Sequence, residues 1–269
     1  MYIGCKMFQK GLNLNMNEPY DRAFILNKLG EYSYKIKENK KGKFEIKKKI
    51  QGEGKLKGYL YEIENDIDLP IIELTKDDSV IMRIDTREIE GTFEIIKWAR
   101  GKVGIVGLGL GYVVQELAQK KEVSEVIVYE KEKEIIDFYN QNFKKDKKIK
   151  IINEDAFESK RQQFDLFYVD IYEYELSLDV VKDYKKFLEI HDIEEYSFWG
   201  VEHFLLSCSY DEIVWVYIPE NWMTMSKNIS GALDSSGYID YYKQLDEKLV
   251  SEVLAEFKLI LNSDDEEEE

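Results

Sequence analysis

Three acidic residues stand where apolar runs of the sequence end. Glu130 closes the run Val-Ile-Val-Tyr, Asp155 follows a short isoleucine-containing run, and Asp170 closes the run Phe-Asp-Leu-Phe-Tyr-Val. A carboxylate can accept hydrogen bonds from the hydroxyl groups or amines of a ligand, and it can take up a proton. Because the carboxyl ends of parallel strands meet at one edge of an open α/β sheet, we expect these acids to share one crevice.

A glycine-rich turn precedes all three acids. Gly107, Gly109 and Gly111 alternate with leucines in KVGIVGLGLGY, between the apolar run 103–106 and an apolar-periodic segment that begins at Val113. This order of strand, glycine turn and helix is the entry to a nucleotide-binding βαβ unit. A Cβ atom at these positions would obstruct the tight turn and the approach of a ligand to the backbone. The first turn of the helix would offer free amides to a polar ligand group.

The acids suit the parts of an adenosine-containing ligand. Glu130 lies nineteen residues after Gly111, where a carboxylate can accept from both hydroxyls of a ribose. Alternatively, Glu130 is an acid at a helix N-terminus, stabilised by the helix dipole. Asp155 can accept from the exocyclic amine of adenine while apolar atoms beside it, including those of Ala156, stack on the ring. Asp170 points into the same crevice.

Continuous apolar strands alternating with amphipathic helices position these residues. We expect strands at residues 103–107, 126–130, 149–153 and 164–170, and helices at 112–120, 133–143 and 178–190. This pattern predicts an α/β fold with a parallel, Rossmann-like, doubly wound sheet. Further on we expect a strand turning into a helix at 196–208, a buried strand at 212–218, a loop at 221–237 and a final helix near 245–257.

The preceding region alternates with the period of strands. We expect a β-hairpin from residue 32 to 46 with its turn at 39–42, strands at 57–63, 71–75 and 80–84, and a helix at 87–100 that Gly101 ends. The predicted organisation is a small β-rich N-terminal domain at residues 1–80, a Rossmann-like domain at 81–262 and a disordered acidic tail at 263–269. A lysine-rich segment, 35–57, indicates either a solvated sheet face or a patch for an acidic partner.

In order and spacing, these motifs resemble those of class I S-adenosylmethionine-dependent methyltransferases, over residues 82–218. The resemblance implies S-adenosylmethionine as cofactor, bound by Gly107, Gly109, Gly111, Glu130, Asp155 and Ala156. Within that superfamily the sequence is most similar to the spermidine synthases, the aminopropyltransferases. Their glycine turn has no acidic residue directly before its first glycine, and in this sequence that position is Val106. That branch implies decarboxylated S-adenosylmethionine, and it casts Asp170 as the base that helps to deprotonate an attacking amine.

The sequence also departs from the spermidine synthases. Their Tyr-His-Glu-like stretch reads Thr92-Phe93-Glu94 here, and the acidic pair and proline after their fourth strand are replaced by residues 171–174, Ile-Tyr-Glu-Tyr. An Asn-Pro-Pro-Tyr type motif, typical of amino-methyltransferases of DNA bases, does not follow Asp170. Tyr172 is a candidate catalytic residue beside Asp170. Glu202 and His203 are further candidate bases, although the apolar surroundings of His203 equally fit a structural histidine.

Net charge, apolar runs and cysteine spacing argue against several classes of protein. The net charge of −16 argues against nucleic acid as a partner. The sequence has no run with the length of a membrane span and no signal-peptide core, which predicts a cytoplasmic protein without a membrane partner. Cys5 and Cys208 lack metal-ligand spacing, so no metal site is expected.

Three functions fit the sequence. The chain is a methyltransferase acting on a small molecule or a protein, an aminopropyltransferase, or a non-catalytic relative that keeps the fold as a binding module. We expect a small-molecule substrate and leave a homodimer open. A NAD-dependent dehydrogenase fits less well, because its glycine turn usually reads G-x-G-x-x-G and no glycine follows at 113 or 114.

Overall fold

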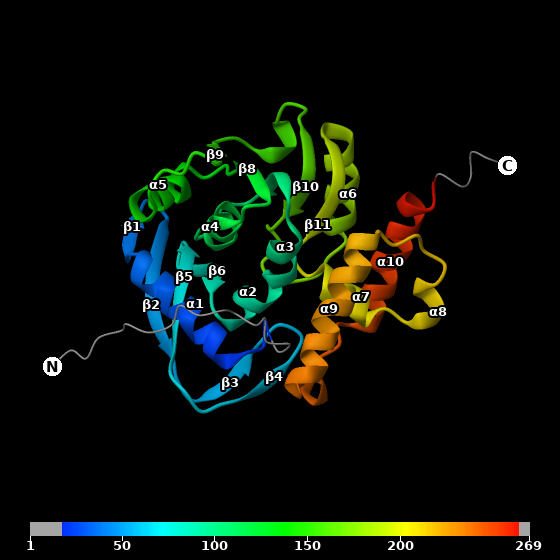
Figure 1. The fold of residues 1–269 in the computed structure, drawn as a ribbon, viewed down its shortest axis with the longest axis horizontal. Helices are drawn as coiled ribbons and strands as arrows, with labels where there is room; N and C mark the ends of the chain where they lie inside the picture. Colours follow the sequence, from blue (N-terminus) through cyan, green and yellow to red (C-terminus); the bar gives the residue numbers. More distant parts are fainter. Residues whose placement is uncertain (1–17, 264–269) are drawn as a thin grey trace.

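A parallel five-stranded sheet forms the centre of the molecule (Figure 1). The computed structural model describes residues 18–263. The strand order is β11-β10-β7-β8-β9, and every neighbouring pair is parallel. The strands are β7 (Gly101–Val106), β8 (Val123–Tyr129), β9 (Ile149–Ile152), β10 (Gln163–Val169) and β11 (Asp192–Phe198). From β7 the chain adds β8 and β9 on one side, and then adds β10 and β11 on the other side. This change of side between β7 and β10 creates the crevice in which open α/β sheets bind ligands.

Helices cover this sheet as the amphipathic pattern predicted. α4 (Tyr112–Gln119) packs on β8, α6 (Asp179–Ile190) packs on β11, and α5 (Lys133–Asn142) connects β8 to β9. The strands are buried because apolar residues fill both of their faces, as in Val126–Tyr129 of β8. The predicted α/β, Rossmann-like fold is therefore confirmed.

A smaller antiparallel sheet precedes it in the chain. Its order is β1-β2-β5-β6, with β1 (Asn39–Lys41), β2 (Phe44–Gln51), β5 (Leu69–Lys76) and β6 (Ser79–Ile84). β3 (Gly54–Lys57) and β4 (Glu62–Asn65) form a separate antiparallel pair. α1 (Arg22–Lys35) packs against β5. The predicted β-rich character of the N-terminal region is confirmed.

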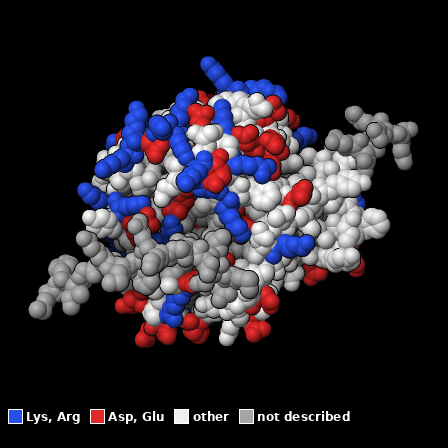
Figure 2. Space-filling model, viewed as in Figure 1, with Lys and Arg blue, Asp and Glu red and all other residues white. Residues whose placement is uncertain are grey.

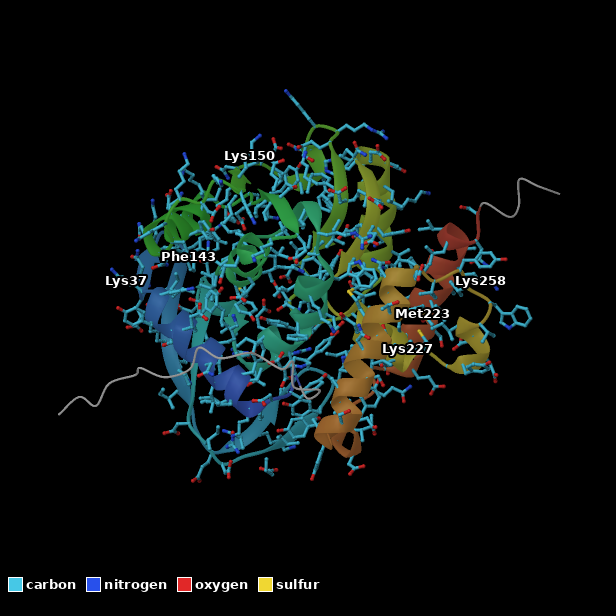
Figure 3. The ribbon with its side chains drawn as sticks, in the orientation of Figure 1. Lys37, Phe143, Lys150, Met223, Lys227 and Lys258 are labelled. Atoms are coloured by element: carbon cyan, nitrogen blue, oxygen red, sulfur yellow. The ribbon has the colours of Figure 1, made fainter. Side chains whose placement is uncertain are left out.

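The start of the predicted hairpin is wrong. Residues 32–36 were expected to form a strand, but α1 continues to Lys35, begins at the N-cap Asp21 and buries Ile25, Leu29 and Tyr32. These three positions follow the helical period, whereas Tyr34 is 90% exposed. The hairpin itself is shorter and turns after Lys41. The segment after α1 contacts the end of α5, where the Lys37 amide donates to Asn142 Oδ1. Figure 3 labels Lys37 and Phe143, the residue after Asn142.

The expected helix at 87–100 is divided into two. α2 (Thr86–Gly91) ends at Thr92 and α3 (Phe93–Trp98) begins directly after it. The Thr92 hydroxyl donates to the carbonyl of Glu88 at 2.7 Å, and the Thr92 amide also donates to carbonyls of α2. The hydroxyl thus competes with the regular helical bonds, and the helix breaks at this residue.

Two C-terminal predictions are wrong. Residues 212–218 form no strand, because α8 (Tyr210–Ile213) covers their start and Trp215 is 69% exposed. The Asn262 side chain accepts from the Tyr217 amide and donates to the Trp215 carbonyl, so these backbone groups are not paired with a strand. Residues 221–237 are not a loop but lie in α9 (Glu220–Ser236), which Gly237 ends with a φ of 79°. The many Ser and Asn residues of this helix conceal its apolar face, on which Trp222 is fully buried.

A C-terminal helical group packs beside the sheet. α7 (Val201–Ser207) follows β11, as predicted, and contacts α9 and α10 (Glu247–Leu261). Phe198, Phe204, Trp222 and Phe257 pack together in its core. In Figure 3 the side chains of Met223 and Lys227 come from α9 and that of Lys258 from α10. The described residues contain no helix that is long and apolar enough to cross a membrane.

Several lysines of the lysine-rich segment form ion pairs with acidic residues. Lys40 and Lys47 contact Glu45, Lys41 contacts Asp137, and Lys49 contacts Glu73. Blue and red side chains are correspondingly interspersed over this region in Figure 2. The charges of these lysines are largely compensated within the chain, which favours the solvated-face interpretation over a patch for an acidic partner.

Candidate functional site

The main cavity lies at the carboxyl ends of β7, β8, β9 and β10. Its volume is about 340 Å³, within the range of small-molecule sites. The glycine turn, the three predicted acids and residues of the antiparallel sheet all contribute to its wall. The residues that line it include Met82, Glu88, Gly107, Gly109, Glu130, Asp155, Ala156, Phe157, Asp170 and Tyr174.

The glycine turn is shaped by its neighbours in the fold. Gly107 has a φ of 96°, and a Cβ there would lie 2.5 Å from the carbonyl oxygen of Asp170. Gly111 has a φ of 80° and caps the N-terminus of α4. Both conformations favour glycine. The close approach of Asp170 explains why the turn and the end of β10 reach the same cavity, and it is a constraint that the sequence alone did not reveal.

Glu130 links the end of β8 to the glycine turn. Its Oε2 accepts from the amide of Leu108 at 3.1 Å, and its Oε1 accepts from the amide of Glu132 at 2.8 Å. The residue is 7% exposed, and burial raises the pKa of its carboxyl above the usual range. Each carboxylate oxygen keeps a further lone pair for a ligand donor. Glu130 is therefore held firmly at the cavity wall with accepting capacity to spare.

Asp155 and Ala156 lie in the turn after β9. Asp155 is the N-cap of a 3₁₀ helix, η1 (Ala156–Glu158), where its side chain accepts from the amide of Phe157. Ser159 holds this turn, because its hydroxyl donates to the Ala156 carbonyl at 2.7 Å and lies 3.2 Å from Nε2 of the buried His191. Asp155 and Ala156 consequently face the cavity on a fixed backbone.

Asp170 faces a second buried acid that the sequence analysis missed. Glu88, on α2, is 1% exposed and lines the same cavity. Burial raises the pKa of Asp170 to about 7. Burial, followed by the charge of Asp170, raises the pKa of Glu88 well above its usual range. No Lys or Arg among residues 18–263 forms an ion pair with either acid, so the pair retains protons that exposed carboxyls would lose.

A sequence signal for Glu88 existed but was weak. Glu88 precedes Ile89 in a segment rich in charged residues, and the helical pattern placed no acid on the buried face. α2 packs against α1 and β6, and Glu88 is among its buried residues. The sequence could therefore have predicted the helix but not the direction of this side chain.

The loop after β10 presents Tyr174 to the cavity. Glu173 and Tyr174 have φ values of 49° and 66°, a left-handed conformation that is uncommon for residues other than glycine. The Tyr174 hydroxyl lies 3.0 Å from Glu88 Oε2, and the Arg87 guanidinium lies 5.0 Å from the centre of the Tyr174 ring. Such backbone strain is commonly stored at functional sites. Here it brings an aromatic hydroxyl to the acidic pair.

Tyr172, the other predicted catalytic residue, lies elsewhere. Its hydroxyl donates to Asp183 of α6 at 3.1 Å, its ring packs against Phe198, and it does not line the cavity. Glu202 accepts from the Tyr59 hydroxyl, and Nε2 of His203 contacts the carbonyl of Lys243. These two residues also lie outside the cavity lining. Within the described residues, the structure thus brings Asp170 together with the predicted cofactor-binding residues except Gly111, which caps α4 and does not line the cavity. The Tyr172 side chain points away from this cavity.

The described part of the chain offers no metal site. Residues 18–263 contain no group of three or more His, Cys, Asp or Glu side chains arranged to hold a metal ion. Cys208 donates to the Phe204 carbonyl within the C-terminal helices. Cys5 and the acidic tail after residue 263 lie outside the described residues.

No protein-family model matches the sequence, and no curated protein matches it either. Solved structures match over part of the chain. The 23S rRNA methyltransferase ErmE is 19% identical over 40% of this chain and 44% of its own, with a TM-score of 0.31. Trm5b from Pyrococcus abyssi is 14% identical over 69% of this chain and 54% of its own, with a TM-score of 0.37.

A spermidine synthase from Thermotoga maritima also matches. It is 13% identical over 70% of this chain and 64% of its own, with a TM-score of 0.35. The chain therefore spans less than two thirds of each of these three structures. Each likeness covers only part of this chain and of the matching structure.

Proposed function

We propose that this chain is a transferase that binds S-adenosylmethionine, or its decarboxylated form, in the main cavity. One observation carries the proposal: the glycine turn, Glu130, Asp155 and Asp170 reach the same cavity from four strand ends, those of β7, β8, β9 and β10. This is the arrangement in which an open α/β sheet binds a nucleotide-like ligand.

The residues present fit such a ligand. Glu130 would accept from the ribose hydroxyls, since each of its oxygens retains a lone pair beside the amide that it already accepts. Asp155 would accept from the adenine amine, and Ala156 and the partly exposed Phe157 offer apolar surface for the ring. A Cβ at Gly107 would lie 2.5 Å from the Asp170 carbonyl oxygen, and one at Gly109 would lie 2.5 Å from Met82 Sδ. Glycine therefore lets the backbone follow this path along the cavity wall.

The bound cofactor would supply a carbon activated by its sulfonium leaving group. The chain's own contribution is to align the acceptor, to exclude water and, where the acceptor carries a proton, to accept it. Asp170 is the residue proposed for this last role. Its raised pKa, about 7, suits proton exchange near neutral pH.

Aminopropyl transfer is the second candidate, and the acidic pair favours it. Glu88 is buried and Asp170 is half-buried, and neither carboxyl has a paired cation among the described residues. A cationic amine acceptor would neutralise them, whereas a neutral acceptor would leave them protonated. The partial likenesses include enzymes of both reaction types and do not choose between them.

Calorimetric titration separates these possibilities. We expect S-adenosylhomocysteine or methylthioadenosine to bind, and to bind more weakly to the variant Glu130→Gln. A preference for methylthioadenosine would favour aminopropyl transfer, and a preference for S-adenosylhomocysteine would favour methyl transfer. Binding of neither compound, nor of S-adenosylmethionine, would contradict both proposals.

A further inference from the structure

A second, smaller cavity lies between α1, β4 and α2. It shares no lining residue with the main cavity, and its volume of about 80 Å³ has room for a few water-sized groups. Aliphatic side chains from α1 and three strands form much of its wall: Ile25, Leu56, Ile63 and Leu69. These residues suit the hydrocarbon part of a small ligand.

Two polar side chains of α2 line this cavity. Glu90 is 1% exposed, accepts from the Tyr59 amide at 2.7 Å and from the Tyr61 hydroxyl at 2.8 Å, and has no ion pair within residues 18–263. Thr86 is 3% exposed, and its Oγ1 has no hydrogen-bond partner among the described residues. A buried carboxyl without a cation and a buried hydroxyl without a partner are both unfavourable. A ligand that donates hydrogen bonds would satisfy both groups.

Aromatic rings and acids complete the surroundings. The rings of Tyr61 and Tyr238 stack at 4.5 Å, and the edge of Tyr20 packs against both rings. Glu64 and Asp66 also line the cavity, while Arg22 is the only cationic side chain among its lining residues and is already paired with Asp66. Electron-rich rings and uncompensated carboxyls attract cations.

We propose that this second cavity binds a small organic cation, an alkylammonium whose charged group contacts Glu90 and Thr86. An ammonium group offers three donors, which matches a carboxylate beside a free hydroxyl oxygen. The hydrocarbon part lies among the aliphatic residues. α2 contributes to both cavities, with Glu88 in the first and Thr86 and Glu90 in the second, so the test must distinguish the two sites.

The test is calorimetric titration of the full chain with propylammonium, with 1-propanol as the neutral comparison. We expect millimolar or tighter binding of propylammonium, and binding of 1-propanol weaker by about tenfold or more. Burial raises the pKa of Glu90 well above its usual range, so the carboxyl becomes charged when a cation binds beside it. Glu90→Gln cannot become charged and should weaken binding by about tenfold or more. Glu158→Gln, an exposed acid that lines neither cavity, is the matched control and should leave this binding unchanged. Asp170→Asn reports whether the cation binds in the main cavity instead.

Thr86→Val is a second test, needed because Glu90 also accepts from the Tyr59 amide and its substitution could disturb the fold. The substitution preserves side-chain shape and breaks no existing hydrogen bond, so the variant should fold and bind propylammonium several-fold more weakly. The proposal is overturned by absence of binding up to about 10 mM, by equal binding of 1-propanol, or by full affinity in Thr86→Val. Loss of binding in Asp170→Asn alone would place the cation in the main cavity and would also overturn it.

Discussion

The carboxyls of Glu88 and Asp170 line one cavity, although the first comes from helix α2 and the second from the end of β10. Burial raises the pKa of both acids, and the charge of Asp170 adds to the effect on Glu88. Because like charges in a buried site cannot both form easily, the pair titrates as a unit and retains a proton near neutral pH. This relationship connects the N-terminal region to the nucleotide fold at the point where chemistry is proposed.

The coupling of these acids can be measured by carboxyl-carbon NMR. Asp170→Asn removes the negative charge that faces Glu88, so the pKa of Glu88 should fall. Burial will still hold it above the ordinary value of 4.5. Glu94→Gln, which changes another buried acid of the same region, should leave the titration of Glu88 nearly unchanged. A Glu88 titration that is identical in wild type and Asp170→Asn would contradict the coupling.

Asp155→Ala tests the adenine-binding assignment. We expect S-adenosylhomocysteine to bind more weakly by about 1–3 kcal/mol, because the adenine amine would lose its acceptor. The control is Glu158→Ala, an exposed acid of the same turn that does not line the cavity. Calorimetry measures both. Equal affinities of wild type and Asp155→Ala would remove Asp155 from the site.

Glu202 should make the protein less stable as the pH rises. Burial raises the pKa of Glu202 to about 7 from an ordinary 4.5, so the native state binds this proton more tightly than the unfolded state. Between these two pH values the unfolded state loses the proton first, and the free energy of unfolding falls. Above pH 7 the acid is ionised in both states and the loss is complete.

Glu202→Gln cannot undergo this titration. The Tm of the variant relative to that of wild type should therefore rise by about 5 °C between pH 4.5 and pH 8, measured by thermal unfolding. Glu256→Gln, in an exposed position of α10, provides the comparison. A Tm difference that stays constant with pH in Glu202→Gln would show that burial does not shift this carboxyl.

Gly107→Ala should destabilise the protein even without a ligand. The added Cβ would lie 2.5 Å from the Asp170 carbonyl oxygen at a φ of 96°, and we expect a loss of about 2 kcal/mol or more in the free energy of unfolding. Gly231→Ala is the opposite case, because nothing lies within 4 Å of its Cβ position in α9. That variant should gain about 0.5–1 kcal/mol from helix propensity. Urea denaturation measures both, and a neutral Gly107→Ala would contradict the packing account.

The strong periodic segments of the sequence predicted their structure well. The strands near Val103, Val126 and Phe164 and the helices between them appear where the pattern placed them, since continuous apolar runs must be buried on both faces. Segments with mixed signals were harder to predict. Tyr32 and Ile36 alternate as in a strand and also fit a helical face, and only the Asp21 cap and packing against β5 select the helix.

Local periodicity and the common edge of parallel strands were enough to predict the parallel sheet, the glycine turn and the positions of Glu130, Asp155 and Asp170 at strand ends. Tertiary structure alone decided that Glu88 joins Asp170 while Tyr172 turns toward Asp183. The reason is physical: side-chain direction in these segments depends on the helix break at Thr92 and on the left-handed residues Glu173 and Tyr174. Packing between segments distant in the chain sustains both features.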